Sequence, residues 1–299
     1  MRCCENFWRI GAVVSALSIT ACGGGSQGPT FHPIEGLTGK LAYITNVERT
    51  GFIEYQLRLL DLETGATRTI YTSPAGEHIS AVAWHPDGTS LVITTASFST
   101  GPSNSVLHLL NEDGSILAGA PNGIGPEFGA SYSPQGALAY CGGFTPDAGL
   151  FINGLSVWPS DCRPDSPAWF PDGSALAMGA YVGGILGLYR VDISSRSATL
   201  IVAAPSPGGN VASSDVSPNG DVIAVPVADA EGWEIWLIQL DGSGSAVLPG
   251  SIEAFDPQWS PDASRIVFVQ SLRPYVHELA TGTVTRIIYT QVVSLAWYP

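Results

Sequence analysis

Carboxylate side chains are the groups of this sequence with the clearest capacity to bind something. Eleven of them lie in or beside the longer connections between short β-rich runs, namely Glu48, Glu54, Glu77, Glu127, Asp147, Asp161, Asp165, Asp229, Glu231, Glu253 and Asp256. Only Arg49, Arg163 and Arg273 accompany them, so the set carries a net charge of −8. Such a surface could attract a cationic partner through complementary charge. The alternative is a solvated acidic rim that keeps the protein soluble.

Four of these carboxylates are candidates for a binding face. Glu127, Asp165 and Asp256 come near the start of predicted inner strands, and Glu77 precedes another. Where inner strands surround a central channel, their first side chains can approach it. Carboxylate oxygens are the ligands that Ca²⁺ prefers. A cationic ligand at this end of the strands is therefore the functional hypothesis, with Asp165 and Asp256 as the candidate Ca²⁺ ligands, beside the solvated rim as the alternative.

Catalytic motifs do not appear in the sequence. Gly154-Leu-Ser-Val-Trp158 lacks the final glycine of a nucleophile elbow. The five histidines show no metal-ligand spacing, and Lys40 is the only lysine. We therefore expect no catalytic residue, and no cofactor except the Ca²⁺ considered above. The alternative is a lyase or hydrolase that acts on carbohydrate in the channel, which would need converging His, Arg and Glu side chains.

A short turn recurs along the chain and identifies the elements that position these groups. Trp84-His-Pro-Asp-Gly88 is the first example. The residues that begin its six occurrences are Trp84, Tyr132, Trp169, Val216, Trp259 and Trp297. The steps between these residues are 48, 37, 47, 43 and 38. A supersecondary unit that repeats at about 40 to 50 residues is typical of a propeller or a solenoid.

The residue types of the repeated motif favour a tight turn between two strands. Proline presets the second position of a type I turn, and glycine accepts the positive φ that re-enters the sheet. Ala263 replaces that glycine in one copy. The aromatic residue before the turn recurs at one structural position, which favours a packing role between sheets, with sugar stacking as the alternative.

Four strands fit most repeats, and the two ends of the chain complement each other. The domain opens at Gly39-Lys40-Leu41, which should follow such a turn, and closes at Trp297-Tyr-Pro299, which should precede one. The third repeat offers only Leu150–Asn153 and Leu155–Trp158 after its second strand. We predict an all-β, six-bladed β-propeller over residues 39–299, with four-stranded antiparallel blades and the C-terminal strand completing the first blade.

The N-terminal residues have the features of an export signal. Basic Arg2 and Arg9 precede a short apolar run, too short to span a bilayer. Ile19-Thr-Ala-Cys22, followed by Gly23, resembles a bacterial lipobox. The resemblance implies a signal peptide over residues 1–21, a lipid on Cys22 and a flexible tether over 22–38. Because Gly23 is not aspartate, the Gram-negative sorting rule implies the outer membrane, facing the periplasm, rather than the inner membrane.

Two cysteines remain in the predicted mature domain. Cys141 and Cys162 would close a loop of about 20 residues if they paired, as thiols of exported proteins commonly do. Two separate buried thiols are the alternative. The net charge of −14 argues against nucleic acid and anionic lipid surfaces as partners, and we expect a monomer.

The repeats resemble those of the TolB-like propeller family and of the propellers attached to prolyl oligopeptidases. The resemblance covers about residues 39–299 and rests on the turn motif and the aromatic residue before it. It implies the fold more than the function. We expect a non-enzymatic, lipid-anchored envelope propeller that binds a protein or a cationic ligand. A carbohydrate-active enzyme and a TolB-like envelope assembly component are the alternatives.

Overall fold

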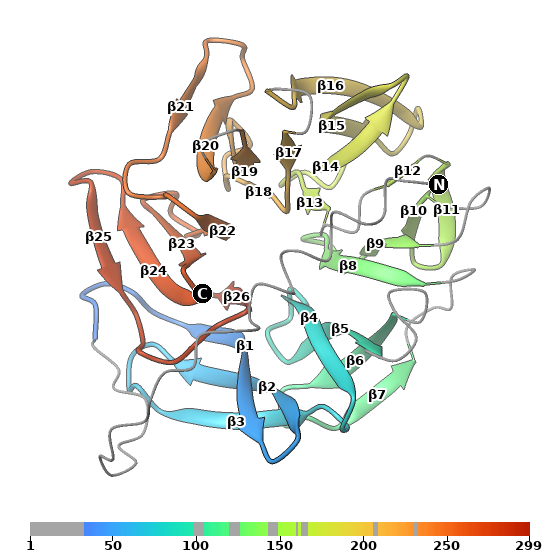
Figure 1. Cartoon of the computed structure of the whole chain (residues 1–299). Helices are drawn as coiled ribbons and strands as arrows, with labels where there is room; N and C mark the ends of the chain where they lie inside the picture. Colours follow the sequence, from blue (N-terminus) through green and yellow to red (C-terminus); the bar gives the residue numbers. More distant parts are fainter. Residues whose placement is uncertain are drawn as a thin grey trace. The chain divides into compact units, whose positions relative to one another are not determined.

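The computed structural model describes residues 33–97, 105–119, 126–142, 149–159, 161–162, 167–205, 209–229 and 232–299. Within these ranges the regular structure is entirely β, and it forms six antiparallel sheets. Figure 1 shows these sheets arranged as a ring. The all-β, six-bladed propeller expected from the repeat is therefore confirmed.

The first three blades follow the chain from its N-terminal side. Blade 1 contains β26 (Ser294–Tyr298), β1 (Lys40–Arg49), β2 (Phe52–Asp61) and β3 (Thr67–Thr72). Blade 2 contains β4 (Glu77–Trp84), β5 (Ser90–Ser97), β6 (Val106–Asn111) and β7 (Ile116–Gly119). Blade 3 contains β8 (Glu127–Tyr132), β9 (Leu138–Gly142), β10 (Gly149–Ile152) and β11 (Leu155–Pro159). The third repeat is therefore a complete blade with short outer strands.

The remaining blades repeat the pattern with variations at the inner edge. Blade 4 contains β12 (Asp161–Cys162), β13 (Ala168–Trp169), β14 (Ala175–Val182), β15 (Ile185–Asp192) and β16 (Ser197–Ala203). Blade 5 contains β17 (Asn210–Val211), β18 (Asp215–Val216), β19 (Val222–Ala228), β20 (Trp233–Gln239) and β21 (Ser245–Val247). Blade 6 contains β22 (Ala254–Trp259), β23 (Arg265–Gln270), β24 (Arg273–Glu278) and β25 (Thr283–Arg286).

Ring closure occurs within blade 1. The last strand, β26, pairs with β1 in antiparallel register, with Leu41 opposite Trp297 and Lys40 opposite Tyr298. A sheet assembled from both ends of the domain sequence thus joins blade 6 to blade 2, as the complementary ends predict.

Two strands of the later blades are irregular. The inner strand of blade 5 is interrupted: β17 and β18 both pair with β19, and the Ala212 N–H still donates to the Pro226 carbonyl at 3.0 Å, but Ser213 and Ser214 leave the ladder. The outer strand of blade 6, β25, ends at Arg286. Ile287 and Ile288 are fully buried in the core between blades 6 and 1, so the chain must leave the sheet edge to bury them.

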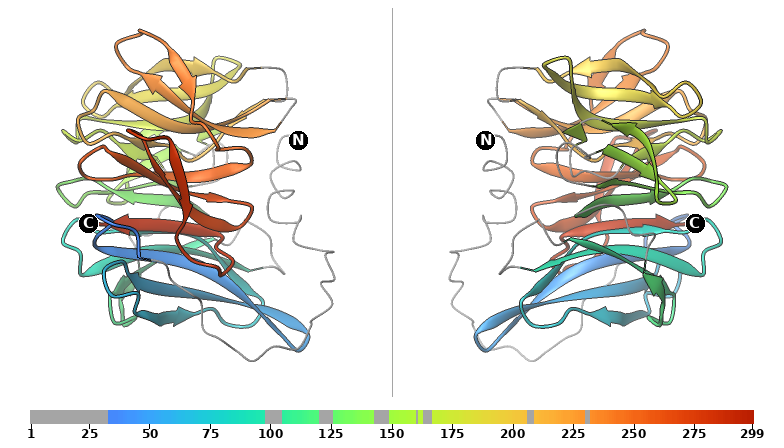
Figure 2. Two further views of the ribbon diagram at one scale, coloured as in Figure 1. Left: turned by 90° about the vertical axis from the view of Figure 1, so that its left-hand side faces the viewer. Right: turned by 90° about the vertical axis from the view of Figure 1, so that its right-hand side faces the viewer.

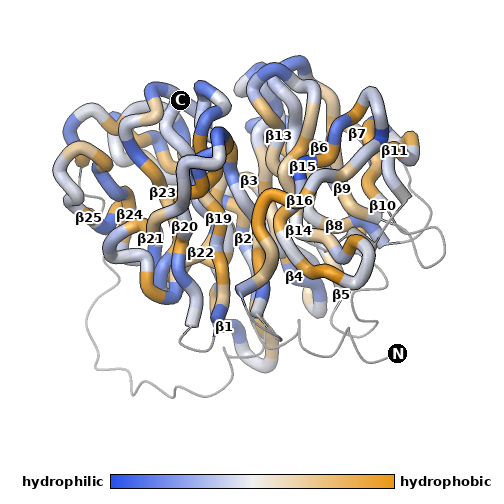
Figure 3. Tube along the Cα trace, turned by 90° about the horizontal axis from the view of Figure 1, so that it is seen from above, coloured by the Kyte–Doolittle hydropathy of each residue, from blue (hydrophilic) through white to orange (hydrophobic). Residues whose placement is uncertain are grey.

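The core lies between neighbouring blades rather than inside any one of them. Each of the six hydrophobic clusters joins residues of two adjacent sheets. Figure 3 shows hydrophobic stretches along the strands and hydrophilic turns near the C-terminal end. Each blade must therefore be covered on both faces by its neighbours, which is the packing rule of a closed propeller.

The recurrent residue before each turn packs into these clusters. Trp84 and Val216 are buried, and Tyr132, Trp169, Trp259 and Trp297 pack against the clusters while partly exposed. The indole Nε1 of Trp84 donates to the Ala296 carbonyl at 3.1 Å, and that of Trp169 donates to the Ser131 carbonyl at 3.3 Å. Both acceptors belong to the inner strand of the preceding blade, so the residues act as wedges between sheets.

Replacing Ala263 by glycine should stabilise the protein. Ala263 has a φ of +56°, whereas Gly88, Gly136, Gly173 and Gly220 occupy the equivalent turn positions at φ between +68° and +84°. A left-handed conformation is costly for a residue with a Cβ atom. We expect Ala263→Gly to raise the free energy of unfolding by about 0.5–1 kcal/mol in urea titrations, after the larger unfolded-state entropy of glycine is deducted.

Gly220 provides the matched control for this measurement. A Cβ atom added there would meet only Pro171, at 3.6 Å or beyond, so backbone strain is the main expected effect. Gly220→Ala should therefore lower the free energy of unfolding by about 1 kcal/mol. A destabilised Ala263→Gly variant would contradict the strain argument.

Candidate binding face

The two ends of the ring differ in the segments that they carry. The end that we call the turn face holds the turns after the inner strands, the turns between third and fourth strands, and the C-terminus. The opposite end, the loop face, holds the connections between second and third strands and those between blades. Figure 2 shows the C-terminus on one side of the ring and the tip of the long β1–β2 hairpin on the other.

Aspartates of the turn face are occupied within their own turns. Each of seven accepts the backbone N–H of a serine or threonine two or three residues later, at 2.7–3.0 Å; these are Asp61, Asp87, Asp113, Asp172, Asp192, Asp241 and Asp262. The Ser195 N–H and the hydroxyls of Ser194 and Ser195 lower the pKa of Asp192 to about 2. These carboxylates stabilise turns.

Two described carboxylates of the loop face, Glu48 and Glu253, lack such partners, whereas others are engaged. Glu54 pairs with Arg49 at 2.8 Å between Oε1 and Nη2. Glu48 and Glu253 are exposed and make no side-chain hydrogen bond or ion pair within the described part of the chain. Asp147, Asp165, Arg163 and Glu231 lie outside the described residues, and only the backbone of Asp161 is described.

Glu127 is a buried structural group rather than an exposed one. Its side chain is 4% exposed, and its Oε2 accepts the Leu107 N–H of the neighbouring blade at 3.2 Å. Ser73 and Ser251 accept the N–H of Tyr55 and Ile235 in the same way at 3.1 and 3.0 Å. Glu127 therefore replaces a serine that joins one blade to the next, and it leaves the set of exposed binding candidates.

Glu77 lies at the start of β4 and is half-buried. Its backbone carbonyl accepts the Ser73 hydroxyl at 3.1 Å. Burial, and to a lesser extent the negative charge of Glu77, raises the pKa of Tyr71. The carboxylate thus lies near an aromatic side chain on the outer strand of blade 1 as well as at the loop face.

Asp256 and Asp215 join inner strands of consecutive blades. Asp256 sits on a bulge of β22 with a φ of +55°, and its Oδ2 accepts the Ser294 hydroxyl at 2.7 Å and the Leu295 N–H at 2.9 Å. Asp215 Oδ2 accepts the Trp259 N–H at 2.7 Å. One carboxylate therefore links blade 5 to blade 6, and the other links blade 6 to blade 1.

Burial raises the pKa of both carboxyl groups. For Asp215 burial outweighs the N–H groups of Trp259 and Val216, and the charge of Asp256 adds to it, so the pKa is raised to about 7. For Asp256 burial outweighs the bonds from Ser294 and Leu295. Asp215 therefore holds its proton part of the time at neutral pH, a property typical of functional carboxyl groups.

Asp215 was missed by the sequence analysis. It occupies the position just before the wedge residue, where Trp84, Trp169 and Trp297 are each preceded by alanine. An acidic residue at a position that is alanine or serine in four of the other five repeats, and Gln258 in the fifth, was the available signal. The signal was weak, because a single departure in one repeat is equally typical of a surface substitution.

The residues described do not assemble a metal site. No group of three or more His, Cys, Asp and Glu side chains that could hold a metal ion occurs among them. Oδ2 of Asp256 is already shared by two hydrogen-bond donors, and Asp165 lies outside the described residues. The Ca²⁺ site expected at Asp165 and Asp256 stays a prediction.

Cys141 is buried and disulfide-bonded. Cys162 lies in β12, where its backbone pairs with Ala180, but its side chain is outside the described part of the structure. The pairing of the two cysteines therefore stays a prediction. Cys22 and the expected signal peptide are also outside the described residues, and no described helix is long and apolar enough to cross a membrane.

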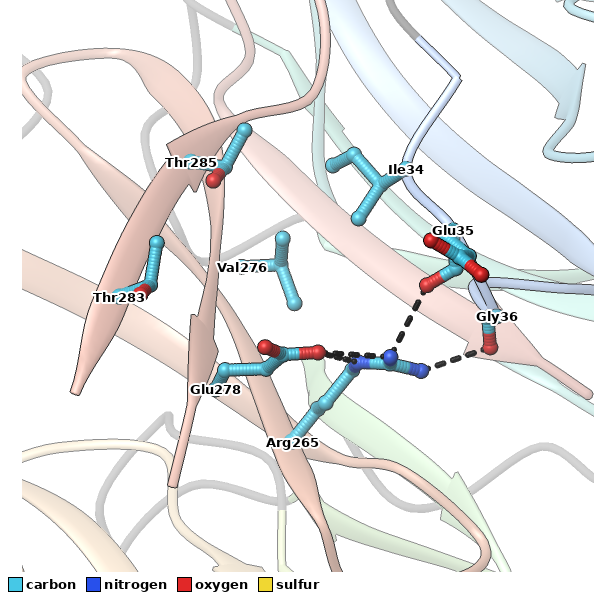
Figure 4. A pocket seen from close by; sticks show the side chains of 8 residues that line it. All are labelled: Ile34, Glu35, Gly36, Arg265, Val276, Glu278, Thr283 and Thr285. Atoms are coloured by element: carbon cyan, nitrogen blue, oxygen red, sulfur yellow. Dashed lines mark hydrogen bonds and ion pairs between the residues drawn. The ribbon is translucent and has the colours of Figure 1, made fainter. Parts of the chain in front are cut away.

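A cleft of about 390 Å³ lies on blade 6, between β24, β25 and residues 34–36. Figure 4 shows Arg265 on one side of the cleft, facing Glu278, Glu35 and Gly36. The guanidinium donates to Glu278 Oε1 at 2.7 and 3.0 Å, to the Gly36 carbonyl at 2.7 Å and to the Glu35 carbonyl at 2.9 Å. Because these partners engage all three of its nitrogens, Arg265 clamps the segment before β1 onto blade 6.

Comparisons with known proteins agree on the fold. TolB from Acinetobacter baumannii superposes with a TM-score of 0.70 and 19% identity, over 87% of this chain and 67% of that one. A putative TolB from Agrobacterium tumefaciens has a TM-score of 0.61 and 19% identity, over 88% of this chain and 100% of that one. A chain of a nidogen–laminin complex has a TM-score of 0.63 and 10% identity, over 86% of this chain and 98% of that one. At these identities the likeness establishes a TolB-like propeller fold.

No family model and no curated protein matches the chain.

Replacing Asp215 by asparagine should alter how stability depends on pH. Because its pKa is raised from 3.8 to about 7, the folded protein keeps a proton that the unfolded chain releases. The stability that Asp215 contributes therefore falls as pH rises from about 4 to about 7. We therefore compare the free energy of unfolding of Asp215→Asn with that of the native protein in urea titrations. The difference, variant minus native, should be larger at pH 8 than at pH 5 by about 1–3 kcal/mol.

Asp192→Asn is the matched control, because the pKa of Asp192 is lowered to about 2. The stability from this group is complete above the unfolded pKa near 4 and is lost only as pH falls towards 2. Asp192→Asn should therefore lower the free energy of unfolding by the same amount at pH 5 and pH 8. An Asp215→Asn effect that is equal at the two pH values would refute the raised pKa.

Proposed function

We propose that the protein is a non-enzymatic, lipid-anchored β-propeller of the bacterial envelope, and that its loop face binds a basic segment of another envelope protein. The observation that carries this proposal is the difference between the two faces. Aspartates of the turn face are held by their own turns, whereas Glu48 and Glu253 of the loop face are exposed without a partner among the described residues.

Apolar side chains on the loop face support a protein partner. Six large ones are exposed at strand ends there: Phe52, Val106, Tyr181, Ile185, Ile252 and Val293. Exposed apolar groups surrounded by polar ones are characteristic of protein interaction sites. Together with the acidic residues they suit a partner segment that carries both lysine or arginine and apolar side chains.

The likeness in fold to TolB structures supports an envelope location. An assembly role like that of TolB is a narrower form of the proposal. The lipobox residues support attachment through Cys22, with the outer membrane favoured by Gly23.

Asp215 favours one second candidate, an enzyme that acts on carbohydrate. A carboxyl group with a pKa of about 7 could serve as a general acid, and Asp256 lies close enough for its charge to affect that pKa. Both carboxyl groups, however, already accept backbone N–H groups that hold blades together. Envelope polysaccharide cleavage that is lost in Asp215→Asn would favour the enzyme over the binding protein.

Lipidation gives a direct test of the anchor. Cys22→Ser should abolish incorporation of an alkyne-labelled palmitate and release the protein from the membrane fraction. Cys4→Ser, which alters a cysteine within the expected signal peptide, should leave the label and the membrane fraction unchanged. If both variants, Cys22→Ser included, still incorporated the label, acylation of Cys22 would be excluded.

Binding can be tested in living cells with a photo-crosslinking amino acid placed on either face. Positions Thr50 and Gly183 sample the loop face, and Ile116 and Leu155 sample exposed positions near the turn face. We expect protein adducts from the loop-face positions only, weakened in spheroplasts at high salt because the attraction is electrostatic. Adducts confined to Ile116 or Leu155 would overturn the proposed binding face.

A further inference from the structure

Backbone strain gathers at one corner of the loop face. The non-glycine residues with positive φ in the described ranges are Asn153, Arg196, Glu253, Asp256, Ala263, Ser271 and Leu272. Four of these seven lie at the loop-face end of blade 6, on the approach to β22, in β22 and in the β23–β24 turn. Left-handed backbone is unfavourable for such residues, and strain of this kind is concentrated at functional sites.

Leu272 shows that the strain is not a local preference of the sequence. A two-residue hairpin turn with both φ values positive is normally made by asparagine or glycine. Here Ser271 and Leu272 adopt it, at +48° and +57°. The Leu272 carbonyl accepts the Val292 N–H at 2.9 Å, so the turn is held against the segment that leads to β26.

The neighbouring segment, residues 250–253, is fixed by several hydrogen bonds. Gln270 Nε2 donates to the carbonyls of Gly250 and Ile252 at 3.0 and 2.7 Å. The Glu253 N–H donates to the Trp233 carbonyl at 2.7 Å. Ile252 is nevertheless 66% exposed, so a fixed segment holds an apolar side chain in solvent.

Apolar and acidic groups meet at this corner. The rings of Trp233 and Phe255 lie 5.2 Å apart, tilted by 58°, and both are half-buried. Glu253 is exposed, and a Cβ atom added to Gly232 would meet its Oε1 at 2.5 Å, which places the carboxylate over the start of β20. Val293 is exposed next to Val292. We call Ile252, Glu253, Leu272 and Val293 the blade 6 corner.

We infer that the blade 6 corner is the anchor point for the partner, an extended basic segment of another protein. The inference rests on the proposed function and places it at one site. Apolar side chains of the partner pack against Ile252 and against Val293, and a neighbouring lysine or arginine pairs with Glu253. Because the corner is ordered before binding, little entropy is lost there, and few residues carry most of the affinity.

Charge complementarity selects this occupant. Glu253 has no ion-pair partner among the described residues. Arg273, at the start of β24, keeps its positive charge while one guanidinium N–H donates to the Leu272 carbonyl at 3.4 Å, so the attraction for a partner's lysine or arginine is assigned to Glu253 alone. An anionic membrane surface would be repelled by the same carboxylate and by the overall charge of −14.

The test places the photo-crosslinking residue at Ser271, beside the corner, in the full-length chain in cells. We expect the strongest protein adduct of the loop face there, and mass spectrometry should map it to a partner segment with Lys or Arg next to an apolar residue. Ile252→Ser and Glu253→Gln should each reduce this adduct at least tenfold. Ile116→Ser, which changes an exposed isoleucine near the turn face, should leave it unchanged.

A stability measurement separates binding from folding. Leu272→Gly should raise the melting temperature, because it relieves a positive φ, and should still weaken the adduct because the corner becomes less ordered. Ile252→Ser should leave the melting temperature unchanged, since the side chain is mostly exposed.

The outcomes distinguish this inference from the proposed function. Adducts at Thr50 or Gly183 without one at Ser271 would overturn the anchor point and leave the loop face in place. An adduct at Ser271 that Ile252→Ser and Glu253→Gln do not reduce, or that maps to lipid or to an acidic segment, would also overturn it. The absence of adducts at every loop-face position would overturn both.

Discussion

Every blade of this protein depends on being covered from both sides. A four-stranded sheet whose strands are rich in apolar residues cannot expose either face to water, and here each interblade cluster consists of residues from two sheets. The closure of the ring by β26 and β1 is what removes the last uncovered face. The positions of the loops, and hence of any binding surface, follow from this single requirement.

The inner edge of the ring poses a second problem, which specific side chains solve. Inner strands have one edge that no strand of their own blade pairs with. Indole N–H groups of Trp84 and Trp169, and the carboxylates of Asp215 and Asp256, supply bonds between neighbouring inner strands instead. Burial of two carboxyl groups is tolerated because each receives backbone N–H donors.

The repeat made the fold predictable, and single positions explain what was not. The six occurrences of the turn that begins at Trp84 predicted six blades, because proline and glycine have a fixed conformational role in that turn. Glu127 could not be placed from the sequence, since a carboxylate at the start of an inner strand can face the channel or the neighbouring blade. Asp215 was overlooked for a related reason, because the burial that raises its pKa arises only when blades 5 and 6 pack together, and the charge of Asp256, which adds to it, belongs to a residue distant in sequence.

The clamp formed by Arg265 determines how the ring would respond to a mechanical load. A pull on the chain ahead of Ile34 reaches Arg265 and Glu278 before it reaches β1, because both backbone carbonyls that the guanidinium binds precede that strand. Force would therefore pass sideways into blade 6 through an ion pair and two hydrogen bonds. The β1–β26 pairing, which closes the ring, would be protected from peeling as long as those bonds hold.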